Sequence, residues 1–197
     1  MTATIDYPAR LTIDYPDRPL DRLSTAFRLL WVIPIAIVAG FASATDAGWG
    51  GALFVPVLLL IVVRQKYPRW WFDFNRELTR FTSRVGAYLA LMTDRYPSTD
   101  EEQTVHLELD YPDVRRDLNR WLPLVKWFLA IPHFVVLVFL SIGALFAAIA
   151  AWFAILATGR YPRGLFDFVE GVMRWWLRVN AYAFLLVTDE YPPFRLS

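Results

Sequence analysis

Residues 127–159 read WFLAIPHFVVLVFLSIGALFAAIAAWFAILATG and contain no Lys, Arg, Asp or Glu. Lys126 and Arg160 bound this run. About 20 helical residues cross a hydrocarbon core of about 30 Å, so the run is too long for one ordinary span and too apolar for a soluble core helix. We therefore expect a transmembrane hairpin with spans at about 120–141 and 144–158, turning at Ser-Ile-Gly, residues 141–143.

The first half of the chain carries a similar pattern. Two apolar runs, at about 23–42 and 52–63, flank residues 43–51, whose Gly, Ser and Thr content is typical of a loop and includes Asp46. This predicts a second hairpin with a longer tip. The fold class expected from both halves is an all-α membrane protein with four transmembrane helices.

An internal repeat with a period of about 95 residues supports that reading. LTIDYPD at 11–17 matches LELDYPD at 107–113, and each half closes with Thr-Asp-x-Tyr-Pro, at 93–97 and 188–192. A fixed period is typical of a duplicated structural unit. We therefore predict two tandem membrane repeats, residues 1–98 and 99–197.

Two further element types are expected in each repeat. Seven of the nine tyrosines precede Pro, which disfavours helix, and the alternating segments 10–14 and 105–110 next to such pairs are candidate strands that could pair with each other. Residues 72–92 and 165–187 place apolar side chains at helical spacing opposite arginines. These amphipathic helices lie in the membrane interface or cap the bundle, and the sequence leaves both readings open.

The basic residues suggest an orientation. All 20 Lys and Arg lie outside 29–63 and 127–159, so hairpin tips facing away from the cytoplasm would satisfy the positive-inside tendency. We expect a multi-pass protein with both termini cytoplasmic. An aromatic belt at the ends of spans or on the amphipathic helices would then include Trp31, Trp49, Trp70, Trp71, Trp121, Trp127, Trp175 and Trp176.

Composition argues against several kinds of chemistry. The chain is 56% hydrophobic with a mean hydropathy of +0.34, and its net charge of +1 gives no electrostatic reason to expect nucleic acid. It has no Cys, which excludes disulfides and thiolate metal sites. No common nucleotide, hydrolase or zinc motif occurs. We therefore expect no enzymatic activity, no cofactor and no metal.

Few side chains remain as candidates for a site. His133 lies inside the second apolar run, so it is a weak candidate for haem ligation or proton transfer, against a neutral His satisfied by the backbone or headgroups. Asp73 and Asp167, each between two Phe, are expected to cap a helix or to pair with Arg69 or Arg163. Asp94 and Asp189 are expected to hold turns, and the acidic residues 100–102 to form a solvated linker.

Two larger sets are candidates for binding. A basic set either attracts anionic lipid headgroups or only anchors the topology; it comprises Arg64, Lys66, Arg69, Arg76, Arg80, Arg84, Arg160, Arg163, Arg174 and Arg178. A stripe of small residues would let a neighbouring span, here or in a partner, approach closely; it comprises Gly143, Ala147, Ala151, Ala154 and Thr158.

The second half also carries a resemblance. The residues WLPLVKW at 121–127, AIPH at 130–133, GRYPRGLFDF at 159–168 and AYAFLLVTD at 181–189 closely resemble the domain-of-unknown-function 4389 family of bacterial membrane proteins. The first half looks like a diverged copy that lacks the Trp-Leu-Pro entry and the His. The resemblance implies a small integral module of the bacterial cytoplasmic membrane and implies no particular activity.

Three functions follow as hypotheses. The first is a non-catalytic scaffold or accessory subunit that packs against a membrane protein partner or another copy of itself. The alternative is lipid binding or transport, with anionic lipids held by the basic helices. The third is an enzyme acting on lipids, for which His133, Asp73 and Asp167 are the only candidate residues.

Overall fold

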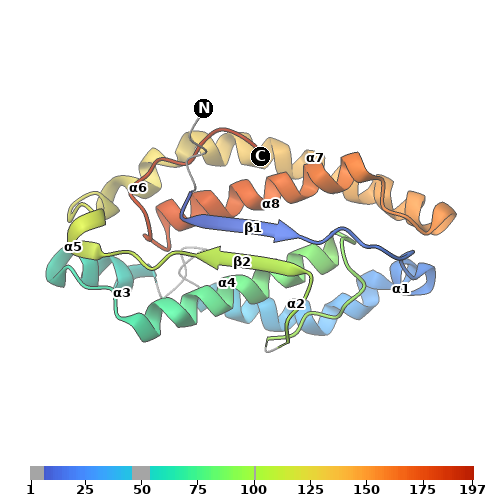
Figure 1. The fold of residues 1–197 in the computed structure, drawn as a ribbon, viewed down its shortest axis with the longest axis horizontal. Coiled ribbons are helices and arrows are strands. Elements are labelled where there is room, and N and C mark those ends of the chain that lie inside the picture. The colour runs from blue at the N-terminus through green and yellow to red at the C-terminus, as the bar shows by residue number, and fades with distance from the viewer. Residues whose placement is uncertain (1–6, 46–53, 100) are drawn as a thin grey trace.

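The computed structural model describes residues 7–45, 54–99 and 101–197 (Figure 1). The predicted tip residues Asp46 and Trp49, and Asp100 of the predicted linker, lie outside the described residues. The strands are β1 (Ala9–Ile13) and β2 (Val105–Leu109). The helices are α1 (Arg22–Ala26), α2 (Arg28–Thr45), α3 (Phe54–Leu59) with its π-helical continuation η2 (Leu60–Arg64), α4 (Arg69–Leu89), α5 (Val114–Asp117), α6 (Pro123–Leu129), α7 (Ile131–Thr158) and α8 (Arg163–Ala183).

The predicted hairpin of the second half is wrong, because α7 runs unbroken through Ser141, Ile142 and Gly143. Its 28 residues extend about 42 Å at 1.5 Å per residue. Gly143 permits a close approach instead of a turn: a Cβ added there would lie 3.3 Å from Cζ of Phe168. The actual break falls earlier, at Ala130, and α7 begins at Ile131 with Pro132 in its first turn.

This correction removes the basis for the predicted orientation. Lys126 and Arg160 now lie at opposite ends of the α6–α7 run, so no hairpin brings these two cations together at one end. Within the described residues, α7 is the one helix long and apolar enough to cross a membrane, with a mean hydropathy of 2.7. Four spans are not supported.

The first half departs from the hairpin as well. Helix α2 packs on α4, while α3 lies farther along the long axis at the other end of the molecule (Figure 1). Pro34 sits inside α2 without ending it. The described parts of the two predicted arms therefore do not lie side by side as a hairpin.

The two amphipathic helices are confirmed, as α4 and α8. Each begins directly after a Tyr-Pro pair, with Pro68 or Pro162 at the N-cap. One side of α4 packs on α2 and the other on β2, while α8 lies between α7 and β1. Both helices therefore form a middle layer of the protein.

The predicted strand pair is confirmed too. β1 and β2 are antiparallel, and Leu11 stands opposite Leu107, its equivalent in the repeat. Since equivalent residues face each other across an isologous contact, a pseudo-twofold axis passes through this pair. Each strand packs on the amphipathic helix of the other half, β1 on α8 and β2 on α4, so the two repeats exchange strands.

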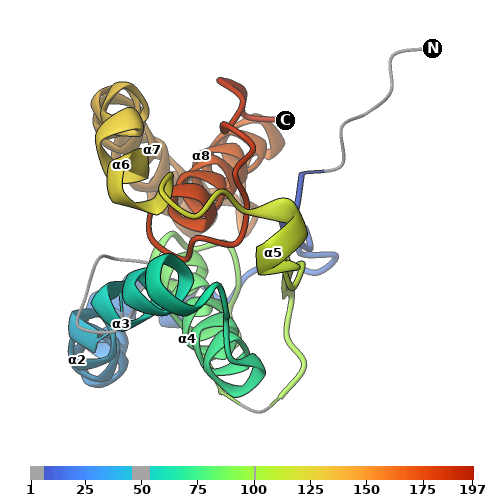
Figure 2. The same cartoon turned by 90° about the vertical axis from the view of Figure 1, so that its left-hand side faces the viewer.

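The elements form three layers when viewed along the long axis (Figure 2). The apolar helices α2, α3, α6 and α7 lie on one side, α4 and α8 in the middle, and the strand ribbon on the other side. Alternate strand residues Ala9, Leu11 and Ile13 are buried against the helices, whereas Thr12 and Asp14 are exposed.

Substitution of Leu11 tests how much the strand pair at the pseudo-twofold axis contributes to stability. Leu11→Ala removes a side chain that is 1% exposed, so we expect a loss of about 2–5 kcal/mol in the free energy of unfolding, measured by denaturant titration in detergent micelles. The matched control Thr12→Ala, on the exposed side of the same strand, is expected to change it by less than about 0.5 kcal/mol. Equal effects would contradict the observed register.

Candidate functional site

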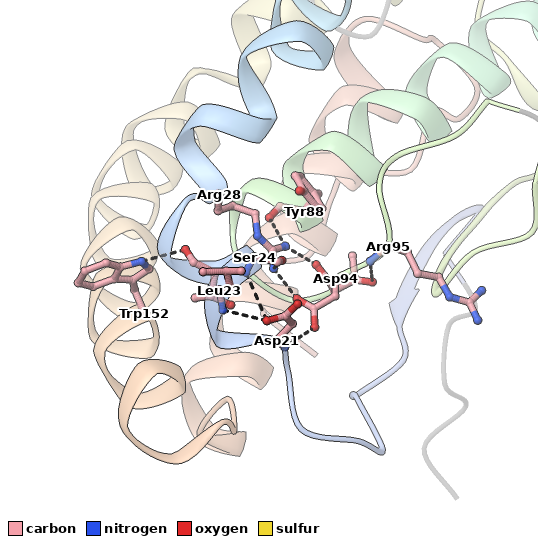
Figure 3. A network of polar contacts seen from close by, with 10 residues as sticks. Asp21, Leu23, Ser24, Arg28, Tyr88, Asp94, Arg95 and Trp152 are labelled. Atoms are coloured by element: carbon pink, nitrogen blue, oxygen red, sulfur yellow. Dashed lines mark hydrogen bonds and ion pairs between the residues drawn. The ribbon is translucent and has the colours of Figure 1, made fainter.

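A buried arginine organises the first repeat at the start of α2 (Figure 3). Arg28 is 2% exposed, and its guanidinium donates to the backbone oxygens of Tyr88 (3.2 Å) and Thr93 (2.5 Å) and to Oδ1 of Asp94 (2.5 Å). It also lies over the Tyr88 ring, 4.3 Å from the centroid. The second carboxylate oxygen of Asp94 accepts from the backbone N–H of Asp21 at 2.8 Å. The start of α2 is thereby fixed to the segment that follows α4.

A buried lysine takes the same place in the second repeat. Lys126 is fully buried, and its Nζ lies 2.6 Å from both the backbone oxygen of Thr188 and Oδ1 of Asp189. The ammonium lies over the Tyr182 ring at 5.1 Å, and Asp189 also accepts from the backbone N–H of Asn119. Burial lowers the pKa of Lys126, and the bond to Asp189 opposes that shift.

The sequence reading missed these two cations. Asp94 and Asp189 were expected only to hold turns, and Lys126 only to mark the end of an apolar run. A signal was present, because Arg28 and Lys126 both precede an apolar run, and each half closes with the same Thr-Asp-x-Tyr-Pro motif. Since each cation is buried and contacts backbone and carboxylate oxygens of the segment after the amphipathic helix, these clusters hold each repeat together.

His133 is a packed core residue. Its Nδ1 accepts from Nε1 of Trp175 at 3.1 Å, and its ring stacks on Phe194 at 3.9 Å between centroids. The side chain is 0% exposed. No group of three His, Asp or Glu suited to a metal occurs among the described residues. Trp175 is itself buried, so it is not part of an aromatic belt.

Four of the predicted headgroup-binding arginines point into the protein. Arg174 donates to the backbone oxygen of Leu11 at 2.9 Å, and Arg80 reaches that of Leu107, the equivalent residue, at 3.4 Å. Arg84 and Arg178 are 6% and 7% exposed and donate to backbone oxygens of the segments that follow their own helices. These side chains join the amphipathic helices to the strands and termini.

Of the remaining members of the basic set, Arg76 is partly buried in α4, and the other five are exposed and lie near the two ends of the molecule. Arg64 ends η2, Lys66 follows it and Arg69 begins α4, while Arg160 and Arg163 lie where the chain passes from α7 to α8. The two structural carboxylates lie among them. Asp73 pairs with Arg69 at 3.6 Å and Arg76 at 3.3 Å, and Asp167 pairs with Arg163 at 3.1 Å, all as surface contacts within a helix.

The small-residue stripe is used inside the chain. Ala147 and Ala151 are buried in the core, α1 packs on α7, and Nε1 of Trp152 donates to the backbone oxygen of Thr25 in α1 at 3.1 Å. Gly143 lies against Phe168 of α8, and Ala154 is half-buried. Most residues of the stripe therefore pack against other parts of the same chain, so the stripe does not identify an external partner.

The opposite side of α7 is exposed and apolar. Its large exposed side chains recur at three- and four-residue spacing and are Val135, Val138, Phe139, Ile142, Leu145, Phe146, Ile149 and Phe153. Helix α2 exposes a similar set, which includes Leu30, Ile37 and Phe41. We call the exposed side of α2, α3, α6 and α7 the apolar layer. A contiguous exposed apolar surface of this kind marks an interaction site.

A groove of about 420 Å³ lies between the two repeats, within the usual size range of ligand pockets. It is lined by α4 from the first repeat and by α7 and α8 from the second. Leu89 and Leu145 line it and are about half exposed, at 49% and 60%, so the groove opens at the apolar layer. At its buried part, Oδ1 of Asn180 has no hydrogen-bond partner among the described residues.

Substitution of the buried ion pair of Lys126 and Asp189 tests whether this pair stabilises the second repeat. Asp189→Ala leaves the Lys126 ammonium buried without its counter-ion, so we expect a loss of about 3–5 kcal/mol in the free energy of unfolding. The control Asp167→Ala removes an exposed pair and is expected to cost less than about 1 kcal/mol. The double variant Lys126→Met/Asp189→Asn should recover most of the loss; no recovery would contradict an electrostatic origin.

Comparison with known proteins places the chain in a family. No curated protein and no solved structure matches it. The sequence model of the family described as Domain of unknown function (DUF4389) matches two regions, residues 22–99 and 121–195. One region falls in each repeat and covers most of its helices, whereas β1 and β2 lie outside both regions. The chain therefore belongs to the DUF4389 family and carries two tandem copies of its domain.

Proposed function

We propose that this protein is a non-catalytic membrane protein that binds lipid, with the apolar layer among acyl chains and one chain seated in the groove between the repeats. The groove carries this proposal, because it opens onto the apolar layer rather than onto a charged surface. A lipid chain is the ligand whose chemistry fits both the walls of the groove and the medium around its mouth.

The side chains of the groove support an amphiphilic ligand. Leu89, Leu145 and Met173 offer apolar walls, while Ser141 and Asn180 contribute polar atoms. The open acceptor on Asn180 suits a hydroxyl group of a lipid head or backbone. The exposed cations near the ends of the molecule, Arg64 and Arg160 among them, are suited to phosphate groups of anionic lipids.

The scaffold or accessory-subunit hypothesis assigns the apolar layer to a protein partner instead of lipid. A helical membrane partner, or another copy of this chain, could cover the apolar layer in place of lipid. The small-residue stripe no longer favours it, since Ala147 and Ala151 are buried in the core of the same chain. Cross-linking in native membranes distinguishes this hypothesis, because only an accessory subunit gives a defined protein adduct through α7.

Filling the groove tests lipid binding. Ala148 lines the groove, so Ala148→Phe should displace the bound chain, and native mass spectrometry of protein purified in mild detergent should show at least a tenfold lower fraction of lipid-bound protein than for the wild type. The loss is expected because the new ring occupies the volume that the acyl chain needs.

Ala150→Phe is the matched control. Ala150 lies on the same helix, is exposed and is not part of the groove lining, so lipid retention should be unchanged. Wild-type protein that carries no lipid, or equal retention by both variants, would count against the proposal.

A further inference from the structure

We infer that the molecule lies flat in one leaflet, with its long axis parallel to the membrane plane, the apolar layer among the acyl chains and the strand ribbon in water. This inference rests on the proposed membrane function, but it adds an orientation that α7 alone would not suggest. A helix of 28 apolar residues ordinarily indicates a span. The rest of the fold decides against that pose.

The strand ribbon lies level with the middle of α7, not beyond either end. Nε1 of Trp176 in α8 donates to Oγ of Ser141 near the midpoint of α7, at 2.9 Å. Two residues earlier, Arg174 donates to the backbone oxygen of Leu11 in β1. The same turn of α8 therefore contacts the middle of α7 on one side and the centre of the ribbon on the other.

The outer side of the ribbon is charged and exposed. Arg10 pairs with Glu108 at 3.0 Å and with Asp110 at 3.2 Å, and His106 lies 3.0 Å from Asp14. The carboxylate side chains of Glu108 and Asp14 are 67% and 62% exposed. If α7 stood along the membrane normal, these groups would lie at the depth of the bilayer centre, where charged side chains facing lipid are strongly disfavoured.

In a flat pose, the apolar layer lies in lipid and the charged ribbon lies in water. The apolar layer and the ribbon lie on opposite sides of α4 and α8 (Figure 2), so one side enters lipid while the other stays in water. The exposed cations near the two ends, such as Lys66 and Arg160, then both lie at the level of the same headgroups. A spanning pose would place those two cations on opposite faces of the membrane.

Helix α7 is compatible with this pose because one side of the helix is buried against the protein and the other side is exposed and apolar. Leu137, Ala147, Ala151 and Ile155 pack on the protein, whereas the opposite stripe is exposed and apolar. A one-sided apolar stripe on a surface-lying helix is the usual arrangement for interfacial insertion. The polar face that an isolated interfacial helix carries is supplied here by α4, α8 and the ribbon.

The absence of cysteine in the chain makes the test simple. Four single-cysteine variants probe the pose with a membrane-impermeant maleimide: Thr12→Cys on the ribbon, Ile142→Cys on the apolar layer, Arg116→Cys in α5 and Arg160→Cys after α7. Sealed inside-out and right-side-out vesicles are compared, and the wild type is the blank. The flat pose predicts that Thr12→Cys, Arg116→Cys and Arg160→Cys label from the same side, at least tenfold more than from the other, and that Ile142→Cys labels from neither.

The alternatives give distinct patterns. Labelling of Arg116→Cys and Arg160→Cys from opposite sides overturns the flat pose but leaves membrane binding intact. Labelling of the two ends from one side without Thr12→Cys also overturns it, because the ribbon is then not in water. Release of the protein by alkaline carbonate, with Ile142→Cys labelled in the soluble fraction, refutes the proposed membrane function itself.

Discussion

The antiparallel pairing of β1 with β2 is the contact on which the rest of the structure depends. It joins two segments about 96 residues apart in sequence, and it places each strand on the amphipathic helix of the other repeat. Two five-residue strands are marginal alone, so the pairing needs the helices beneath it. Arg80 and Arg174 supply that support by donating to the backbone oxygens of Leu107 and Leu11 at the pseudo-twofold axis.

The buried cations perform the complementary task within each repeat. Arg28 is the first residue of α2 and Lys126 lies in α6, just ahead of α7, and their counter-ions Asp94 and Asp189 lie near the end of each repeat. Each repeat is thereby closed by a charged cluster that satisfies backbone oxygens of the segment after its amphipathic helix. Exchange of strands then joins two closed units, which leaves the apolar helices α2 and α7 on one outer side and the charged ribbon on the other.

Much of the architecture could be predicted because its signals are local. Helical periodicity located α4 and α8, Tyr-Pro pairs set their starts, and alternation with the repeat located the two strands. The hairpins could not be predicted reliably, because Ser141 and Gly143 are compatible with a turn and equally with close helix packing. The roles of Arg28, Arg84 and Arg178 depend on backbone oxygens brought near by the fold, so an amphipathic pattern shows a polar side without showing what it faces.

The strand exchange has a consequence for how such a protein is assembled. A chain with a single repeat would present one strand with an unpaired edge and one amphipathic helix without its cover, and only a second chain could complete both. The tandem copy makes the same arrangement intramolecular, so completion no longer depends on protein concentration. It also frees the two repeats to differ, and they do: the sequence between α2 and α3 includes Asp46 and Gly48, whereas α7 is one continuous apolar helix.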